Sequence, residues 1–222
     1  MQAVVMAAGE GRRLRPLTER WPKPILPIDG RPVIATLIHQ LAAEGLGPVT
    51  VVTGHLADQI ERLLDGLDVR FVRQPEPLGS ADAVRRALAE VSQLPAIVTA
   101  ADSVFRRGDL QRFGDEFALS GAAGAIAYVR ARGRAAIRAE NGHVLRVVDP
   151  APGNLAPAPV WGLSEEIDLD GVPGPPYELA VAFQRAIDEG KLIAGIEIGR
   201  TRHLTEPADL VLENFPYLEP HE

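Results

Sequence analysis

The stretch Ala3-Val-Val-Met-Ala-Ala-Gly9-Glu-Gly11-Arg-Arg-Leu-Arg-Pro-Leu-Thr18 carries the strongest structural signal in the chain. Its apolar run passes directly into a loop of glycines and arginines, a pattern typical of a buried parallel strand followed by a ligand-binding turn. Glycines at positions 9 and 11 let backbone N–H groups approach a ligand, and consecutive N–H groups in such a turn bind anions. Adjacent arginines can pair with phosphate oxygens. The sequence therefore predicts a phosphate-binding loop at this strand end.

Two common phosphate-binding motifs do not describe this loop. The dinucleotide-binding fingerprint G-x-G-x-x-G needs a third glycine where Leu14 stands, and the run G-x-x-x-x-G-K-[ST] does not occur. A lysine follows the loop instead, at Lys23, between Pro22 and Pro24. The flanking prolines restrict the local backbone and aim the side chain. The chain has only one other lysine, Lys191, against 21 arginines, so a compact ammonium at position 23 indicates a specific use.

The first half of the chain alternates between strand and helix patterns. Short apolar runs predict strands, and helical spacing of apolar residues predicts the helices between them. The expected strands are 3–7, 49–53, 69–73 and 96–100, and the expected helices are 33–41, 56–64 and 81–90. This alternation predicts an α/β fold with a mostly parallel central sheet and with ligands at the carboxyl ends of the strands.

The second half is less regular, and no internal repeat divides the chain. Asn141-Gly142 is a strong hairpin signal. We expect strands at 124–130, 135–139, 143–148, 159–163 and 192–198, a Pro/Ala-rich loop at 150–159, and helices at 177–189 and 206–213, the last capped by Thr205. One domain over 1–222 is expected.

Composition excludes several classes of function. The formal net charge is −7, so we expect no general electrostatic binding of nucleic acid. The chain has no cysteine, which excludes disulfides and thiolate chemistry. It shows neither a signal-peptide pattern nor an apolar run of the ~18 residues that a membrane span needs. These features predict a cytoplasmic protein that does not bind a membrane.

The segment 6–34 resembles the signature of sugar-1-phosphate nucleotidyltransferases. It reads Met6-Ala-Ala-Gly-Glu-Gly-Arg-Arg-Leu-Arg-Pro-Leu-Thr-Glu-Arg-Trp-Pro-Lys-Pro-Ile-Leu-Pro-Ile-Asp-Gly-Arg-Pro-Val-Ile34. The resemblance implies a Rossmann-like three-layer α/β/α domain, with a nucleotide-binding half at 1–110 and an acceptor-binding half at 111–222. It also implies that the loop holds the nucleotide phosphates, with Arg13 as the signature arginine and Lys23 as the active-site lysine. The loop residues concerned are Ala8, Gly9, Gly11 and Arg12, the last standing where the family usually has threonine.

Two further segments resemble the same family. Gln74-Pro-Glu-Pro-Leu-Gly79-Ser80 is similar to the segment that reads the nucleobase, and an amide can both donate and accept hydrogen bonds. Ser80 also has the character of a helix cap. Ala96-Ile-Val-Thr-Ala-Ala-Asp102 resembles the strand that ends at the metal-binding aspartate. A carboxylate there suits Mg²⁺, or Mn²⁺, bridging phosphates.

The acceptor half departs from the family pattern. Val148-Asp149-Pro150 stands where many members have Glu-Lys-Pro, and His203 stands where a second metal-binding aspartate is expected. Histidine is a poor Mg²⁺ ligand, so Glu197 or phosphate and water are alternatives. The resemblance assigns acceptor contacts to Gly133, Gly162 and Glu178.

The resemblance implies an enzyme that transfers a nucleotide from a nucleoside triphosphate to a sugar 1-phosphate and releases pyrophosphate. Two alternatives stay open. One is a transferase for a non-hexose phosphate, such as phosphocholine or an inositol phosphate. The other is a nucleotide-binding regulatory protein without turnover, which the histidine at position 203 would favour. Neither the base nor the oligomeric state follows from the sequence.

Overall fold

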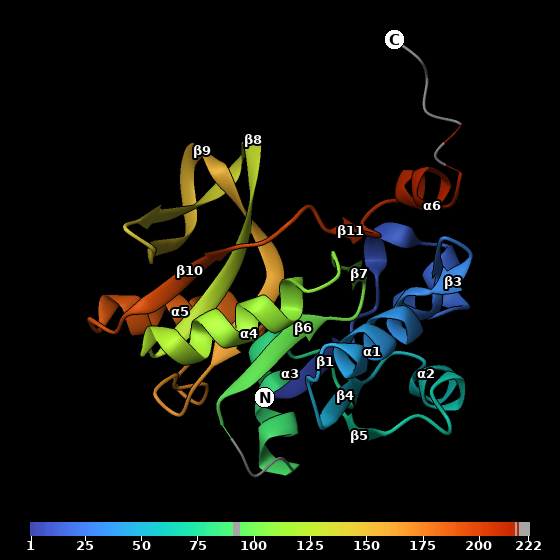
Figure 1. Cartoon of the computed structure of the whole chain (residues 1–222). Helices are drawn as coiled ribbons and strands as arrows, with labels where there is room; N and C mark the ends of the chain where they lie inside the picture. The colour runs from blue at the N-terminus through green and yellow to red at the C-terminus, as the bar shows by residue number, and fades with distance from the viewer. Residues whose placement is uncertain (91–93, 216, 218–222) are drawn as a thin grey trace.

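A seven-stranded mixed sheet forms the centre of the molecule in the computed structural model (Figure 1), which describes residues 1–90, 94–215 and 217, with the backbone alone at 131–136 and 148–153. The strand order is β10-β8-β9-β6-β1-β4-β5. The strands are β1 (Gln2–Ala7), β4 (Val49–Thr53), β5 (Val69–Arg73), β6 (Ala96–Ala100), β8 (Gly124–Glu140), β9 (His143–Leu163) and β10 (Ile193–Glu197).

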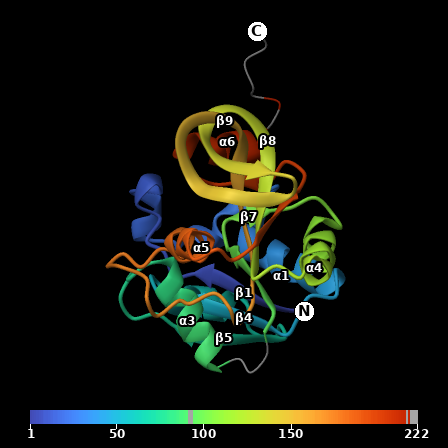
Figure 2. The ribbon, with the colours of Figure 1, turned by 90° about the vertical axis from the view of Figure 1, so that its left-hand side faces the viewer.

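Helices cover both faces of this sheet (Figure 2). They are α1 (Val33–Ala43), α2 (Ala57–Leu63), α3 (Ser80–Glu90), α4 (Asp109–Ser120), α5 (Leu179–Asp188) and α6 (Pro207–Asn214). Buried side chains of α1, α2 and α4 form one apolar cluster, and those of α3 and α5 form a second cluster on the opposite face. Alternate residues of β1 divide between them, with Val5 in the first and Val4 in the second. The expected three-layer α/β/α fold is therefore confirmed.

The parallel strands bring their carboxyl ends to one edge. In register, Ala7 pairs with Thr53, Thr53 pairs with Arg73, and Met6 pairs with Ala100. The loops after β1, β4, β5 and β6 consequently leave the sheet side by side. After β1 come the 3₁₀ turns Arg12–Leu14, Leu17–Glu19 and Lys23–Ile25 and the short strands β2 (Pro27–Ile28) and β3 (Arg31–Pro32). The short strand β7 (Ser103–Val104) follows β6, and its partner β11 (Arg202–His203) follows β10.

The predicted loop at 150–159 is wrong, because this segment belongs to the long strand β9, which pairs with β8 across the hairpin. Prolines are tolerated there because β6 pairs only with Val160–Leu163 and β10 pairs with β9 only at His143, so the proline-containing part between them has β8 as its neighbour strand on one side. Repeated register shifts between β8 and β9 accommodate the irregular sequence.

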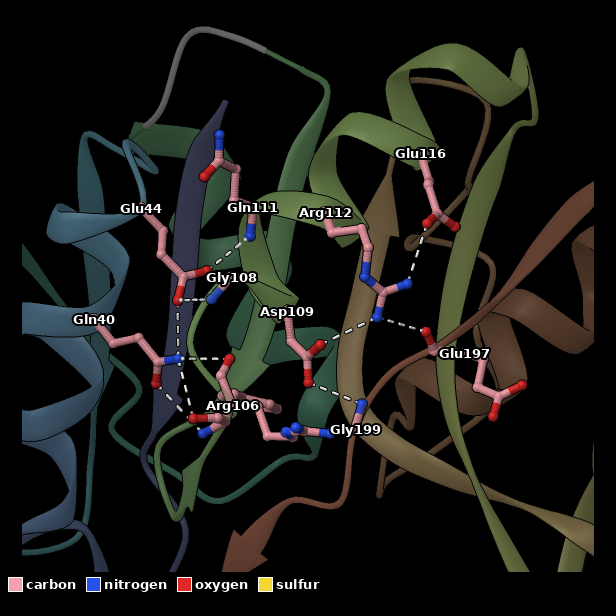
Figure 3. Close-up of polar contacts among 11 residues, drawn as sticks. Gln40, Glu44, Arg106, Gly108, Asp109, Gln111, Arg112, Glu116, Glu197 and Gly199 are labelled. Carbon is pink, nitrogen blue, oxygen red and sulfur yellow. Dashed lines mark hydrogen bonds and ion pairs between the residues drawn. The ribbon is translucent and has the colours of Figure 1, made fainter.

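Helix α4 is absent from the sequence prediction, although Leu110, Phe113 and Phe117 are buried at helical spacing. Its first turn is held by α1: the backbone N–H groups of Gly108 and Gln111 donate to the Glu44 carboxylate, both at 2.9 Å. Figure 3 shows Glu44 and Gln40 reaching across to this loop. These contacts fix the chain segment that follows β6.

The start of α6 also differs from the prediction. Its cap is Glu206, which forms a capping box with Asp209, and Thr205 precedes the cap. At the end of the chain Phe215 makes an edge contact with Tyr217, with ring centroids 6.0 Å apart. Within the described ranges no helix is both long and apolar enough to cross a membrane.

Candidate active site

A cavity of about 300 Å³ opens at the carboxyl edge of the sheet, between the loop after β1 and the end of β6. Its walls combine the glycine loop, the lysine turn and the strand end. They include Gly9, Gly11, Arg12, Arg13, Lys23 and Asp102. Residues that are far apart in sequence therefore converge on one space large enough for a small anionic ligand.

The loop after β1 is rigidly held. Gly11 adopts a left-handed backbone with φ of 63°, and a Cβ there would lie 2.9 Å from Thr18 Cγ2. The Thr18 hydroxyl donates to the Gly11 carbonyl at 3.0 Å. His55, at the end of β4, places Nε2 2.7 Å from the Thr18 carbonyl. Glycine is thus required at position 11, and His55 has a role in supporting the loop.

The loop arginines are divided between internal pairing and the cavity. Arg12 and Arg15 pair with Glu10 at 2.8 and 3.2 Å, and the Arg12 hydrogen bond lowers the pKa of the Glu10 carboxyl. Arg13 lines the cavity and forms no ion pair among the residues the structure describes. Its guanidinium is available to an anionic ligand.

Lys23 and Asp102 meet inside the cavity. The Lys23 ammonium donates to Asp102 Oδ2, and the side chains are 16% and 24% exposed. Ser103 donates to the other carboxylate oxygen at 3.2 Å. The two charges compensate each other. A bound anion would therefore have to replace Asp102 as the partner of Lys23, and a bound cation would have to replace Lys23 as the partner of Asp102.

The donor set fits a metal ion held mainly by its substrate. The described part of the chain contains no group of three or more His, Asp or Glu side chains arranged as a metal site. Asp102 offers one carboxylate, and Mg²⁺ commonly binds one or two carboxylates together with phosphates and water. His203 is exposed in β11, opposite Ser103 of β7. Glu197 pairs with Arg130 at 3.0 Å, which occupies its carboxylate.

The loop after β5 lies beside the loop after β1. Gly54, after β4, is packed so closely that a Cβ would lie 2.8 Å from the Ala8 carbonyl oxygen and 3.0 Å from that of Gln74. The Gln74 side chain is buried, and its amide nitrogen donates to Gly79 and Asp82. The structure therefore brings Gln74 next to the predicted phosphate site.

Ser80 and Glu178 bind each other. The Ser80 hydroxyl donates to the Glu178 carboxylate at 2.6 Å and accepts from the Leu179 N–H at 2.8 Å. Gly79 lies against Tyr177, where a Cβ would be 2.4 Å from the Tyr177 carbonyl oxygen. These contacts join the loop after β5 to the start of α5. Ser80 and Glu178, which the resemblance assigns to the nucleotide and to the acceptor, therefore also have a structural role.

A second cavity, of about 260 Å³, shares Asp102 with the first. Its wall includes Pro157, Pro159 and Trp161, which alternate along β9 and so share one face. Thr201 and His203 close another side. Trp161 and the prolines are not among the predicted site residues, because most of this segment has the composition of a loop.

Gly162 does not line that cavity. It follows Trp161 in β9, so the two residues point to opposite faces of the strand. A Cβ on it would lie 2.5 Å from the Phe117 ring of α4, so helix packing accounts for the glycine. Gly133 belongs to β8 and Asp149 to β9, at positions where the structure describes the backbone only.

Comparison with known proteins identifies the domain type. The family model described as MobA-like NTP transferase domain matches residues 3–186. A solved structure of a UDP-glucose pyrophosphorylase from Acinetobacter baumanii superposes with a TM-score of 0.82 at 20% identity, covering 97% of this chain and 92% of that one. At that identity the likeness concerns the fold.

Two curated relatives match less than half of the chain. The D-glycero-alpha-D-manno-heptose 1-phosphate guanylyltransferase of Aneurinibacillus thermoaerophilus is 28% identical over 109 residues, or 47% of each protein. The CMP-5'-(3-aminopropyl)phosphonate synthase of Streptomyces rubellomurinus is 38% identical over 81 residues, which are 35% of this chain and 13% of that protein. The matched region thus spans less than half of either relative.

Proposed function

The chain belongs to the family of MobA-like NTP transferase domains, and from this membership we propose that it transfers a nucleotidyl group from a nucleoside triphosphate to a sugar 1-phosphate. The observation that carries the proposal is the convergence of Arg13, Lys23 and Asp102 on one cavity beside the glycine loop. Lys23 supplies a positive charge and Asp102 supplies a carboxylate, the two kinds of group that phosphoryl transfer uses.

In the proposed reaction, an oxygen of the acceptor phosphate attacks the α-phosphorus in line. The bond from the α-phosphorus to the bridging oxygen breaks, and pyrophosphate leaves with that oxygen. The Gly9–Gly11 backbone and Arg13 hold the departing phosphates, and Lys23 neutralises charge at the α-phosphate and at the acceptor. Asp102 would hold Mg²⁺ or Mn²⁺, which neutralises developing charge on the phosphates. Such chemistry depends on positioning and electrostatics and needs no protein nucleophile.

A second acceptor class is favoured by one observation. The cavity next to Asp102 has a wall of Pro157, Pro159 and Trp161, which offers few hydrogen-bonding groups for the hydroxyls of a hexose. A small phosphate such as phosphocholine suits an aromatic wall. The name of one relative also describes the synthesis of a CMP-linked aminopropyl phosphonate, whose phosphonate part is not a sugar.

The test is pyrophosphate release with every pair of a common nucleoside triphosphate and an acceptor, in Mg²⁺ or Mn²⁺. The acceptor panel contains sugar 1-phosphates, phosphocholine and an inositol phosphate. Release that requires one nucleotide and one acceptor establishes the reaction and identifies the acceptor class. Nucleotide binding without release for any pair would contradict catalysis and support the regulatory alternative.

Asp102→Asn is the matched variant for this assay. It removes the proposed metal ligand while retaining size, and we expect turnover to fall by about 100-fold or more, the usual scale for a group that stabilises transition-state charge. Near-normal turnover in this variant would remove Asp102 from the mechanism. Ser103→Ala, next to it, removes a neutral hydroxyl and should cost far less.

A further inference from the structure

Asp82 lies at the start of α3 with its side chain completely buried. Its carboxylate accepts three hydrogen bonds. Gln74 Nε2 donates at 2.8 Å, Arg86 Nε donates at 2.7 Å, and an Arg85 guanidinium nitrogen donates at 2.9 Å. Burial alone raises the pKa of Asp82, but these hydrogen bonds outweigh it and hold the pKa below its ordinary value. The carboxylate is therefore ionised at neutral pH and can only accept hydrogen bonds.

The partners of the Gln74 amide determine its orientation. Besides Asp82, the amide meets the Gly79 carbonyl oxygen, to which Nε2 donates at 3.0 Å. Both partners are acceptors, so only the NH₂ end of the amide can face them, and a flipped amide would set oxygen against oxygen. Both amide protons are used in this way. In the described part of the chain the Gln74 side-chain oxygen accepts no hydrogen bond.

The position of Gln74 makes this oxygen relevant to the nucleotide. Its backbone N–H donates to Thr53 at 2.7 Å, and its carbonyl lies against Gly54, which also contacts Ala8 of the phosphate loop. A group presented here would lie beside a nucleotide whose phosphates occupied the loop of Gly9 and Gly11. An amide with its orientation fixed by acceptors would offer that nucleotide an acceptor and no donor.

We propose that Asp82 is a positioning residue that fixes the Gln74 oxygen toward the nucleobase, so that the site selects bases with a ring N–H over those without. This inference rests on the proposed nucleotide-binding function. Uracil, thymine and guanine have a proton on the ring nitrogen of their pairing edge, whereas cytosine and adenine have a lone pair there. An acceptor that faces this ring nitrogen attracts the first group and repels the second. Arg85 and Arg86 contribute by keeping Asp82 charged.

The test is binding of UTP, dTTP, GTP, CTP and ATP to the full chain by titration calorimetry in Mg²⁺ without acceptor. The wild-type protein should bind at least one triphosphate with a ring N–H about tenfold more tightly than CTP and ATP, the scale of one hydrogen bond gained or lost. In Asp82→Asn the new amide can donate to Gln74 and allow it to flip. The preference should then fall toward unity.

Asp109→Asn is the matched control. Asp109 is also a largely buried aspartate in the first turn of a helix, and it accepts from Gly199 and Arg112 away from Gln74. It should leave the ratio of affinities unchanged. A purely structural role for Asp82 would weaken all triphosphates equally with the ratio intact, and that result would overturn the proposal.

A double variant keeps the test decisive if Asp82→Asn folds poorly. Gln74→Glu places a second carboxylate against Asp82 and should abolish selective binding. In Gln74→Glu combined with Asp82→Asn, the new amide at position 82 can again donate a hydrogen bond to an oxygen at position 74. Recovery of the preference in the double variant supports the proposal, and its absence contradicts it. Binding can be measured without turnover, so the result of this test does not depend on the result of the pyrophosphate assay. A wild-type preference for CTP or ATP would overturn the inference even if turnover is found.

Discussion

Lys23 of the 3₁₀ turn Lys23–Ile25 forms an ion pair with Asp102, which follows β6, across 79 positions of sequence. Each side chain is mostly buried and lines the same cavity. A charge pair that is removed from water and open to a ligand is typical of a site prepared for phosphates and a cation.

Lys23→Gln should lower kcat by about 100-fold or more, because it removes a preorganised positive charge from the site of phosphate transfer. Steady-state pyrophosphate release measures this. Lys191→Gln is the control, since Lys191 pairs with Glu189 just beyond the end of α5. Equal losses in the two variants would contradict a specific role for Lys23.

Gly9 and Gly11 should respond differently to alanine. Gly11→Ala should reduce the free energy of unfolding by about 1–2 kcal/mol, because its backbone is left-handed and its Cβ would meet Thr18. A Cβ on Gly9 would meet no atom of the described residues within 4 Å, its chain neighbours aside, so Gly9→Ala should change stability by less than about 0.5 kcal/mol.

Nucleotide affinity shows whether Gly9→Ala acts on ligand binding or on stability. Gly9 lines the cavity, so the new methyl group should weaken triphosphate binding while the melting temperature stays constant. Thermal unfolding and nucleotide titration on the same samples provide the comparison. Unchanged affinity would place the phosphates elsewhere.

Trp161 and Gly162 are adjacent in β9 but should affect different properties. Trp161→Ala should raise the KM for the acceptor by roughly tenfold, since it removes an aromatic wall of the second cavity. Gly162→Ala should cost about 1–3 kcal/mol of stability through overpacking against Phe117, with the acceptor KM unchanged. The opposite outcome, a stable Gly162 variant with an altered KM, would support the acceptor contact that the resemblance implies.

The stability contribution of Asp82 should depend on pH. Its folded-state pKa lies below the ordinary value because hydrogen bonds from Arg86, Gln74 and Arg85 outweigh burial. In acid the unfolded chain therefore binds more protons than the folded chain. The contribution of Asp82 to the free energy of unfolding is complete above the ordinary aspartate pKa of about 3.9. It is lost as the pH falls through the folded-state pKa.

Urea denaturation at neutral pH and at about pH 3.5 checks this expectation. The difference in unfolding free energy between the wild-type protein and Asp82→Asn should narrow in acid. Asp115→Asn changes an exposed aspartate of α4 and should give a small difference at both pH values. A wild-type advantage over Asp82→Asn that grows in acid would contradict the direction of the shift.

Local pattern was sufficient for much of the fold. Apolar runs located β1, β4 and β6 because these parallel strands are buried on both faces, and helical spacing located α1 and α3. The same reasoning failed for β9, whose Pro/Ala-rich segment is a strand only because β8 pairs with it. Helix α4 was overlooked despite apolar spacing that predicts it.

The glycine loop, the arginine and lysine that follow it, and the α/β class can be read from local sequence, because each depends on residues close together in the chain. Three relationships needed the folded chain: Lys23 meets Asp102, Trp161 lines a cavity while Gly162 meets a helix, and Asp82 accepts a hydrogen bond from the Gln74 amide. Such contacts depend on strand order and on which face of an element each side chain occupies, and both are set by packing between segments distant in sequence.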